Sequence, residues 1–179
     1  GFNIDANSFY YESLSDERLW NKMLKKILKI AAIVIVAALI VAQFIRPDLS
    51  NPPINEAETL EASVQVPENI KAIMKRSCSD CHTNTTVYPW YSQISPVSWW
   101  LKNHIDEGRR ELNFSVWATY QPKRKAKKLE EICEQVNEGE MPLPSYTWAY
   151  RVAVLSAEES KALCDWATAE KAKIEIPPA

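Results

Sequence analysis

Two cysteines and a histidine in the middle of the chain have the types and spacing that haem attachment requires. Cys78, Cys81 and His82 form a C-x-x-C-H motif, a pattern typical of covalently bound c-type haem. On one helical turn the two thiols can each form a thioether to one vinyl group of a single porphyrin, and the adjacent imidazole can bind the iron. The motif therefore predicts one covalent haem c, with His82 as the proximal iron ligand.

Two other kinds of site use similar residues. A C-x-x-C pair can be a redox dithiol, or half of a zinc site that recruits His82 and the other histidine, His104. A structural zinc site usually closes with a second ligand pair, but Cys133 and Cys164 lie far apart in the sequence. A redox dithiol is expected beside a βαβ pattern, whereas the flanking sequence here is helical in character. The sequence therefore favours haem attachment.

A haem iron also has a second axial position. Whether a side chain fills it decides between electron transfer and the binding of an external ligand. Met141 is the first candidate, because its thioether lies in the proline-stiffened loop 139–144. A lone methionine more often fills a core, but Met141 lies between Glu140 and Pro142 and not on an apolar helical face. His104 is the alternative ligand and would give a bis-histidine iron. An open axial position is the third alternative.

The two remaining cysteines, Cys133 and Cys164, fall on helices expected before and after the Met141 loop. In an oxidising compartment they could form a disulfide that holds this loop. Otherwise they are free buried thiols. A disulfide requires the two residues to be close in space, which the sequence does not decide.

The composition fits a small helical domain that covers a large apolar group. The 179 residues allow one domain plus appendages, and three glycines against eleven prolines suit helices joined by stiff connections. A net charge of −2 and a pI near 5.8 argue against a nucleic-acid partner, which would require a basic face. Seven tryptophans need an apolar surface to cover, which a porphyrin or an ordinary core would provide.

The N-terminal part of the sequence predicts a membrane anchor. Residues 1–26 are interpreted as a cytoplasmic arm, 27–45 as a single transmembrane helix, and the proline-rich segment 46–66 as a tether. The uncharged stretch 30–45 covers ~24 Å, against a hydrocarbon core of ~30 Å. Lysines that extend to the interface are expected to make up the difference. A cleaved signal peptide and a buried helix are the competing interpretations.

Flanking charges set the predicted orientation of this helix. Four lysines and Arg18 precede it, while Arg46, followed by Asp48, comes after it, so the N-terminus should face the cytoplasm. The chain would then be a single-pass protein of the bacterial inner (cytoplasmic) membrane, in contact with the lipid bilayer. Its haem domain would lie in the periplasm, on the side of the membrane where c-type haem is attached.

Residues 67–179 are predicted to form the haem domain from helices alone. Helices are expected at 68–76, at 96–112 and at about 123–137. A last helix should begin after Ser156, whose side chain can cap it ahead of two glutamates. The expected fold class is therefore all-α, with a single N-terminal transmembrane helix followed by a cytochrome c-like helical haem domain.

Several stretches resemble known haem proteins. The order of a helix, C-x-x-C-H, a long insert, a Met-Pro loop and a terminal helix resembles class I cytochrome c. Residues 67–170 more closely resemble the bacterial haem-binding domain family of membrane-tethered monohaem cytochromes. The matching stretches are 78–82, 88–91, 96–100 with His104, 107–109, 112–115 and 140–143. The resemblance implies thioethers at both cysteines of the motif, ligation by its histidine, and Met141 as the distal ligand, while His104 keeps bis-histidine ligation open.

These features predict a membrane-anchored monohaem c-type cytochrome that carries single electrons on the periplasmic side, and not an enzyme. Its expected partners are other subunits of a respiratory or photosynthetic electron-transfer complex, or a separate redox protein. With an open axial site it would instead be a haem-based ligand sensor or a peroxidase. With an iron that does not change oxidation state it would be a structural assembly subunit. Axial ligation and redox cycling distinguish these hypotheses.

Overall fold

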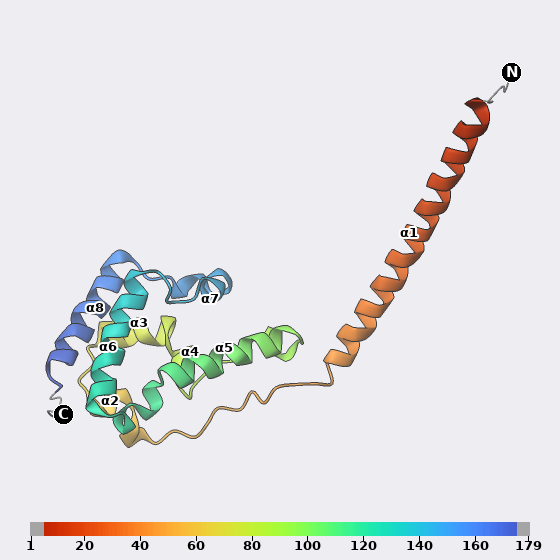
Figure 1. Ribbon diagram of the computed structural model, residues 1–179. Coiled ribbons are helices and arrows are strands. Elements are labelled where there is room, and N and C mark those ends of the chain that lie inside the picture. Colours follow the sequence, from red (N-terminus) through yellow and green to blue (C-terminus); the bar gives the residue numbers. More distant parts are fainter. Residues whose placement is uncertain (1–5, 175–179) are drawn as a thin grey trace.

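The structure is a computed structural model that describes residues 6–174, with side chains from residue 18 onward. The ends of the predicted arm and of the predicted haem domain, residues 1–5 and 175–179, lie outside this range. Figure 1 shows a long N-terminal helix, an extended connection and a group of shorter helices. Helices are the only regular elements in the described range, which confirms the predicted all-α class.

The helices follow one another in a simple order. The α-helices are α1 Ala6–Ala42, α2 Leu60–Ser63, α3 Glu68–Ser77, α4 Ser79–His82, α5 Val97–Glu111, α6 Pro122–Asn137, α7 Pro144–Ala149 and α8 Ala157–Ala172. Short 3-10 helices are η1 Glu56–Glu58, η2 Trp90–Gln93, η3 Phe114–Thr119 and η4 Arg151–Ala153. The helices predicted from sequence correspond to α3, α5, α6 and α8. The sequence pattern gave no indication of α7.

The first helix corrects the predicted membrane anchor. Although α1 is 37 residues long, no helix in the described part of the chain combines the length and the apolar character that a membrane crossing needs. Its lysines end at Lys29 and the helix ends at Ala42, so its uncharged part covers only about 20 Å of a hydrocarbon core of ~30 Å. The transmembrane helix predicted at 27–45 is therefore wrong. The single-pass inner-membrane localisation derived from it is wrong for the same reason.

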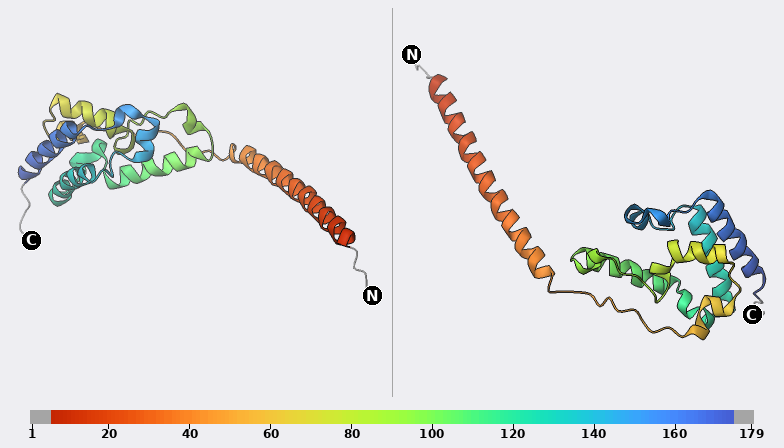
Figure 2. Two further views of the ribbon diagram at one scale, coloured as in Figure 1. Left: turned by 90° about the horizontal axis from the view of Figure 1, so that it is seen from above. Right: turned by 180° about the vertical axis from the view of Figure 1, so that it is seen from behind.

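The segment predicted as a tether, 46–66, contains an extended part and a folded part. Residues 46–55 contain no helix and lead from α1 to the helical domain (Figure 1 and Figure 2). Near the end of the segment, Leu60 and Val66 are buried in the domain core. The extended part is also attached to the domain, since the side chain of Asn84 donates a hydrogen bond to the carbonyl oxygen of Pro53 at 3.2 Å.

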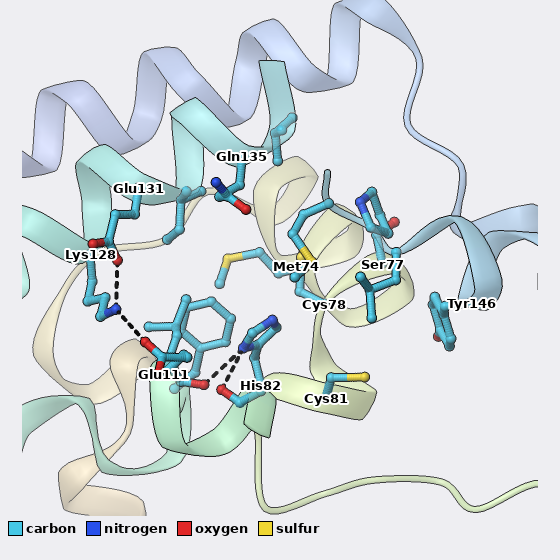
Figure 3. A pocket seen from close by; sticks show the side chains of 18 of the residues that line it. Met74, Ser77, Cys78, Cys81, His82, Glu111, Lys128, Glu131, Gln135 and Tyr146 are labelled. Atoms are coloured by element: carbon cyan, nitrogen blue, oxygen red, sulfur yellow. Dashed lines mark hydrogen bonds and ion pairs between the residues drawn. The ribbon is translucent and has the colours of Figure 1, made fainter. Parts of the chain in front are cut away.

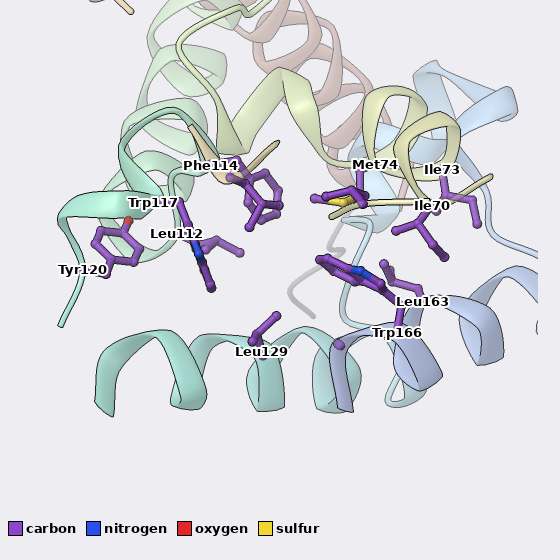
Figure 4. Packing of buried hydrophobic residues seen from close by; sticks show 13 residues of the cluster. Ile70, Ile73, Met74, Leu112, Phe114, Trp117, Tyr120, Leu129, Leu163 and Trp166 are labelled. Atoms are coloured by element: carbon purple, nitrogen blue, oxygen red, sulfur yellow. The ribbon is translucent and has the colours of Figure 1, made fainter. Parts of the chain in front are cut away.

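The apolar core lies between α3, η3, α6 and α8 (Figure 4). Helix α3 buries Ile70, Ile73, Met74 and Ser77, the i, i+3, i+4, i+7 spacing that places residues on one helical face. Its partners across the core are Leu112, Phe114, Trp117, Tyr120, Leu129, Leu163 and Trp166. This packing fixes the C-terminal end of α3, from which the C-x-x-C-H motif continues.

Helices α6 and α8 pack side by side and are covalently joined. Cys133 of α6 and Cys164 of α8 form a disulfide, so of the two alternatives for these cysteines the structure contains the bridged one. Helix α8 begins with a capping box: the Ser156 hydroxyl accepts a hydrogen bond from the Glu159 amide, and the Glu159 carboxylate accepts one from the Ser156 amide. The end of α6 that leads to Met141 is therefore attached to a second, well-capped helix.

Candidate functional site

The C-x-x-C-H residues lie on one helical turn directly after α3. The amides of Cys81 and His82 both donate hydrogen bonds to the carbonyl oxygen of Cys78, at 3.2 and 3.0 Å. The Cys78 amide in turn donates to the carbonyl oxygen of Met74 at 2.8 Å. Because the core packing of α3 fixes Met74, this chain of hydrogen bonds gives the motif a defined orientation.

The thiols of the motif are unpaired and protonated at neutral pH. Both cysteines are free. Burial, followed by the neighbouring Cys81, raises the pKa of Cys78 to about 12. Burial and then Asp80 raise the pKa of Cys81 to about 11. A redox dithiol depends on a lowered pKa, so these thiols do not fit that alternative. In the described part of the chain, no group of three or more His, Cys, Asp or Glu side chains could hold a metal ion, so the zinc alternative lacks a ligand set.

The imidazole of His82 is oriented by two backbone carbonyl groups of α5 and its C-terminus. Its Nδ1 lies 2.9 Å from the oxygen of Leu112 and 3.1 Å from that of Gly108. Carbonyl oxygens can only accept, so Nδ1 carries the hydrogen and Nε2 keeps its lone pair. Burial lowers the pKa of His82, although these two hydrogen bonds act in the opposite direction. The ring is therefore a neutral imidazole with Nε2 available to a metal.

Gly108 allows α5 to approach the motif closely. A Cβ at this position would lie 2.8 Å from the carbonyl oxygen of Cys81 and 3.1 Å from its Cβ. Any larger residue would push α5 away from the motif, and with it the carbonyl groups that hold His82. The next residue, Arg109, donates hydrogen bonds to the Thr83 carbonyl oxygen and to the Thr86 hydroxyl, both at 2.8 Å, and so secures the loop that follows the motif.

Asp80, inside the motif, connects it to α7. The Tyr146 hydroxyl donates a hydrogen bond to Asp80 Oδ2 at 2.8 Å, and the Val87 amide donates to Oδ1 at 3.1 Å. Burial, followed by the hydrogen bond to Asp80, raises the pKa of Tyr146, so the phenol stays protonated and remains a donor. The motif is thus held by α5 through His82 and by α7 through Asp80.

A cavity of about 590 Å³ lies beside the motif (Figure 3). Its wall includes Cys78, Cys81, His82, His104 and Met141. The structure therefore brings together all the residues that the sequence proposed for haem attachment and iron ligation. Apolar side chains make up much of the remaining wall: Met74, Leu112, Phe114, Ile132, Val136, Leu143, Leu155 and Leu163. Such a lining suits a large planar apolar ligand.

Backbone hydrogen bonds hold Met141 at this cavity. Gly139 has a φ of +76°, the left-handed conformation that commonly ends a helix. The chain then folds back, and the amides of Glu140 and Met141 both donate to the carbonyl oxygen of Gln135 at 3.0 Å. Met141 is therefore fixed against the last turn of α6, which contributes Gln135 and Val136 to the cavity wall.

His104 lies in the cavity wall on a different helix from the one that holds Met141. It lies on α5, one turn before Gly108, so it shares a helix with the residue whose carbonyl oxygen orients His82. Its ring centroid is 4.4 Å from that of Trp100. Its Nδ1 is buried and has no hydrogen-bond partner among the described residues. His82 and His104 are thus both associated with α5, whereas Met141 is held by α6.

A protein-family model described as a haem-binding domain matches residues 37–169. The chain belongs to the haem-binding domain family. The matched range contains every residue that lines the cavity. Comparisons with curated proteins and with solved structures found no match. Family membership makes haem the ligand against which the cavity has to be tested.

The cavity of this haem-binding domain fits a haem. Its volume lies within the roughly 300–1,000 Å³ typical of cofactor sites, and its walls are largely apolar. His82 presents an unprotonated Nε2 whose orientation two hydrogen bonds fix. Gly108 lets α5 lie close against Cys81, beside this cavity, and the buried Nδ1 of His104 lacks a partner. Cys78, Cys81, His82 and Met141 are the residues that would hold the haem.

The candidate haem residues predicted from the sequence all line this cavity, but the residues that hold them in place were not predicted. Asp80 and Tyr146 are far apart in the sequence, and their hydrogen bond gives no local signal. Gly108 did leave a signal, because glycine inside a helical pattern often marks a close approach. The charged residue Lys128, which lines the cavity, belongs to a basic run whose sequence pattern is that of an ordinary solvated helix face.

Proposed function

We propose that this protein is a monohaem c-type cytochrome that carries single electrons. Cys78 and Cys81 would hold one haem through thioethers, and His82 Nε2 and Met141 would bind its iron. The bound haem supplies one-electron iron chemistry. The observation that carries the proposal is the orientation of His82, whose Nδ1 is fixed by two carbonyl groups while the ring lines the same cavity as both cysteines and Met141.

Met141 is preferred to His104 as the distal ligand because Met141 is held by a different helix from the one that orients His82. The carbonyl groups of α5 and of Leu112 orient His82, and His104 belongs to that same helix. Two ligands on opposite faces of one porphyrin are more readily supplied by two different walls. Met141 meets this condition, since it is held by the C-terminal turn of α6.

The other residues of the cavity favour electron transfer over chemistry on a bound substrate. Ligation by His82 and Met141 leaves no open axial position. The apolar part of the wall, with Leu112, Phe114 and Val136, offers no acid, base or nucleophile to a bound substrate. The protein is therefore proposed to be an electron carrier and not an enzyme, with one redox protein as donor and another as acceptor, either free or as subunits of one complex.

Carbon monoxide binding to the ferrous full-length protein tests this proposal. Saturated His/Met ligation predicts no rapid change in the absorption spectrum on addition of carbon monoxide, together with reversible one-electron reduction. Met141→Ala should bind carbon monoxide at once, because it opens the distal position. Rapid binding by the unmodified protein would overturn the electron-carrier proposal and favour a ligand sensor or a peroxidase.

A further inference from the structure

A charged cluster of Glu111, Lys128 and Glu131 lies at the cavity wall. Lys128 Nζ is 2.6 Å from Glu131 Oε2 and 3.4 Å from Glu111 Oε2. The Lys128 side chain is only 13 % exposed. Burial alone would raise the pKa of Glu131, but hydrogen bonds from Lys128 and Lys127 hold it below its ordinary value. The cluster is therefore charged and largely shielded from solvent at Lys128.

The position of this cluster relates it to one particular edge of a haem. Figure 3 shows Glu111, Lys128 and Glu131 on one side of the cavity and Cys81 and Tyr146 on the other, with Cys78 between them. In haem, the vinyl groups that form thioethers and the two propionate groups lie on opposite edges of the macrocycle. A porphyrin attached at the cysteines would therefore direct its propionates toward the cluster.

The cluster can receive a carboxylate, but it already contains excess negative charge. A lysine ammonium group has three N–H donors, and Glu111 and Glu131 use two of those on Lys128. Among the described residues that line the cavity, Lys128 is the single lysine or arginine, while the carboxylates there are Glu107, Glu111, Glu131 and Glu134. One donor is thus available to a propionate in surroundings where carboxylates outnumber cations.

Cations just outside the cavity compensate only part of this charge. On α5, Arg110 lies 3.8 Å from Glu107, and both side chains are mostly exposed. On α6, Lys127 lies 3.3 Å from Glu131, and the Lys127 side chain is 71 % exposed. From α4 the titratable group facing the cavity is His82 of the motif, which is neutral. The negative charge of the carboxylates nearest the expected propionates is therefore compensated mainly by Lys128.

We propose that the Glu111–Lys128–Glu131 cluster binds a haem propionate through Lys128 and takes up a proton when the haem is reduced. This inference rests on the proposed function. When a one-electron donor delivers an electron, the site gains one negative charge, and nearby carboxyl groups then bind protons more readily. One carboxyl of the cluster accordingly binds one proton from water. The electron comes from the donor, and no carbon bond forms or breaks.

Spectroelectrochemical titration of the full-length haem-loaded protein tests the inference. The midpoint potential is measured from about pH 4 to about pH 8, a range that starts near the usual glutamate pKa of 4.5. The potential should fall as the pH rises, because proton uptake favours the reduced state. Lys128→Gln should shift the potential downward, since it removes a positive charge near the haem. Glu131→Gln should shift it upward and weaken its dependence on pH.

Matched controls separate this local effect from a general effect of charge. Lys123→Gln and Glu130→Gln make the same charge changes on α6, at residues that do not line the cavity. Both should retain the potential of the unmodified protein, and Lys128→Arg should stay close to it because it keeps the charge. A potential that is independent of pH, or Lys128→Gln equal to Lys123→Gln, would overturn the inference.

The titration of the unmodified protein needs no variant, so a variant that fails to fold leaves the test intact. Failure of the proposed function would look different: the haem would not be reversibly reduced by one electron at any pH. Reversible reduction without pH dependence would leave the electron carrier in place and remove only the propionate and proton site.

Discussion

Gly108 and Cys81 are in direct contact through their backbones. The position that a Cβ would occupy at Gly108 lies 2.8 Å from the carbonyl oxygen of Cys81. The carbonyl oxygen of Gly108 also accepts a hydrogen bond from His82 Nδ1. One residue of α5 therefore sets both the distance of the helix from the motif and the orientation of the expected iron ligand.

We predict that Gly108→Ala destabilises the protein. Alanine is the better helix former by ~1 kcal/mol, but overpacking against Cys81 should cost about 1–3 kcal/mol, so the net free energy of unfolding should fall. The haem content per chain should fall with it, because α5 moves away from His82. Denaturant unfolding and haem quantification measure these effects. Asn103→Ala, at an exposed position of α5, is the control, and equal behaviour of the two variants would contradict the prediction.

Substitution of the two candidate distal ligands should give opposite results. Met141→Ala should abolish the long-wavelength charge-transfer band of a methionine-ligated ferric haem, because the thioether is lost. His104→Ala should retain the band, since His104 shares α5 with the groups that orient His82. Absorption spectra of the two ferric variants at equal haem content show which residue is the distal ligand. Absence of the band from the unmodified protein, with a spectrum that changes in His104→Ala and not in Met141→Ala, would assign the distal position to the histidine.

The Tyr146 hydroxyl should contribute to stability through the motif. Tyr146→Phe removes its hydrogen bond to the Asp80 carboxylate, for which a loss of about 1–2 kcal/mol in the free energy of unfolding is expected. Tyr150→Phe, a neighbouring and more exposed tyrosine, should change it by much less. Chemical denaturation of both variants measures the difference. Equal effects would show that the Asp80 hydrogen bond is not the source of the stabilisation.

Acid should weaken the contact between α3 and α8. The hydrogen bond from the Ser156 amide, followed by that from Arg76, holds the pKa of Glu159 below its usual 4.5. A carboxylate with a lowered pKa in the folded state stabilises fully above its unfolded-state pKa, and this stability is lost as the pH falls through the folded-state value. Glu159→Gln should therefore be less stable than the unmodified protein at neutral pH, by under about 1 kcal/mol for such a partly exposed group.

This stability difference should shrink once the pH falls below about 4.5, the usual glutamate value. Denaturant unfolding at several pH values, with the unmodified protein and Glu159→Gln measured side by side, checks the sign. A difference that stays constant or grows in acid would contradict the assignment of the lowered pKa to Glu159.

The helical fold and the residues around the haem site could be read from the sequence because their signals are local. The spacing of Ile70, Ile73 and Met74 marks the buried face of α3, and Ser156 marks the start of α8 through its capping box. The C-x-x-C-H motif is itself a local pattern. Such features need only a few consecutive residues.

The remaining features depend on contacts between distant residues or on where a helix ends. The hydrogen bond between Asp80 and Tyr146 and the disulfide between Cys133 and Cys164 require knowledge of the packed structure. The membrane helix failed for a different reason: α1 ends at Ala42, so part of the uncharged run is not helical. The stretch is apolar, as the sequence predicts, but its helical part is shorter than predicted.

Covalent attachment of haem to Cys78 and Cys81 is the central claim of the proposed function. Acidic organic extraction, which removes haem that is not covalently bound, followed by intact mass measurement of the chain tests this attachment. The account predicts a mass increased by that of one haem, and loss of this increment in the double variant Cys78→Ser/Cys81→Ser. A chain with the mass of the bare polypeptide after extraction would contradict it.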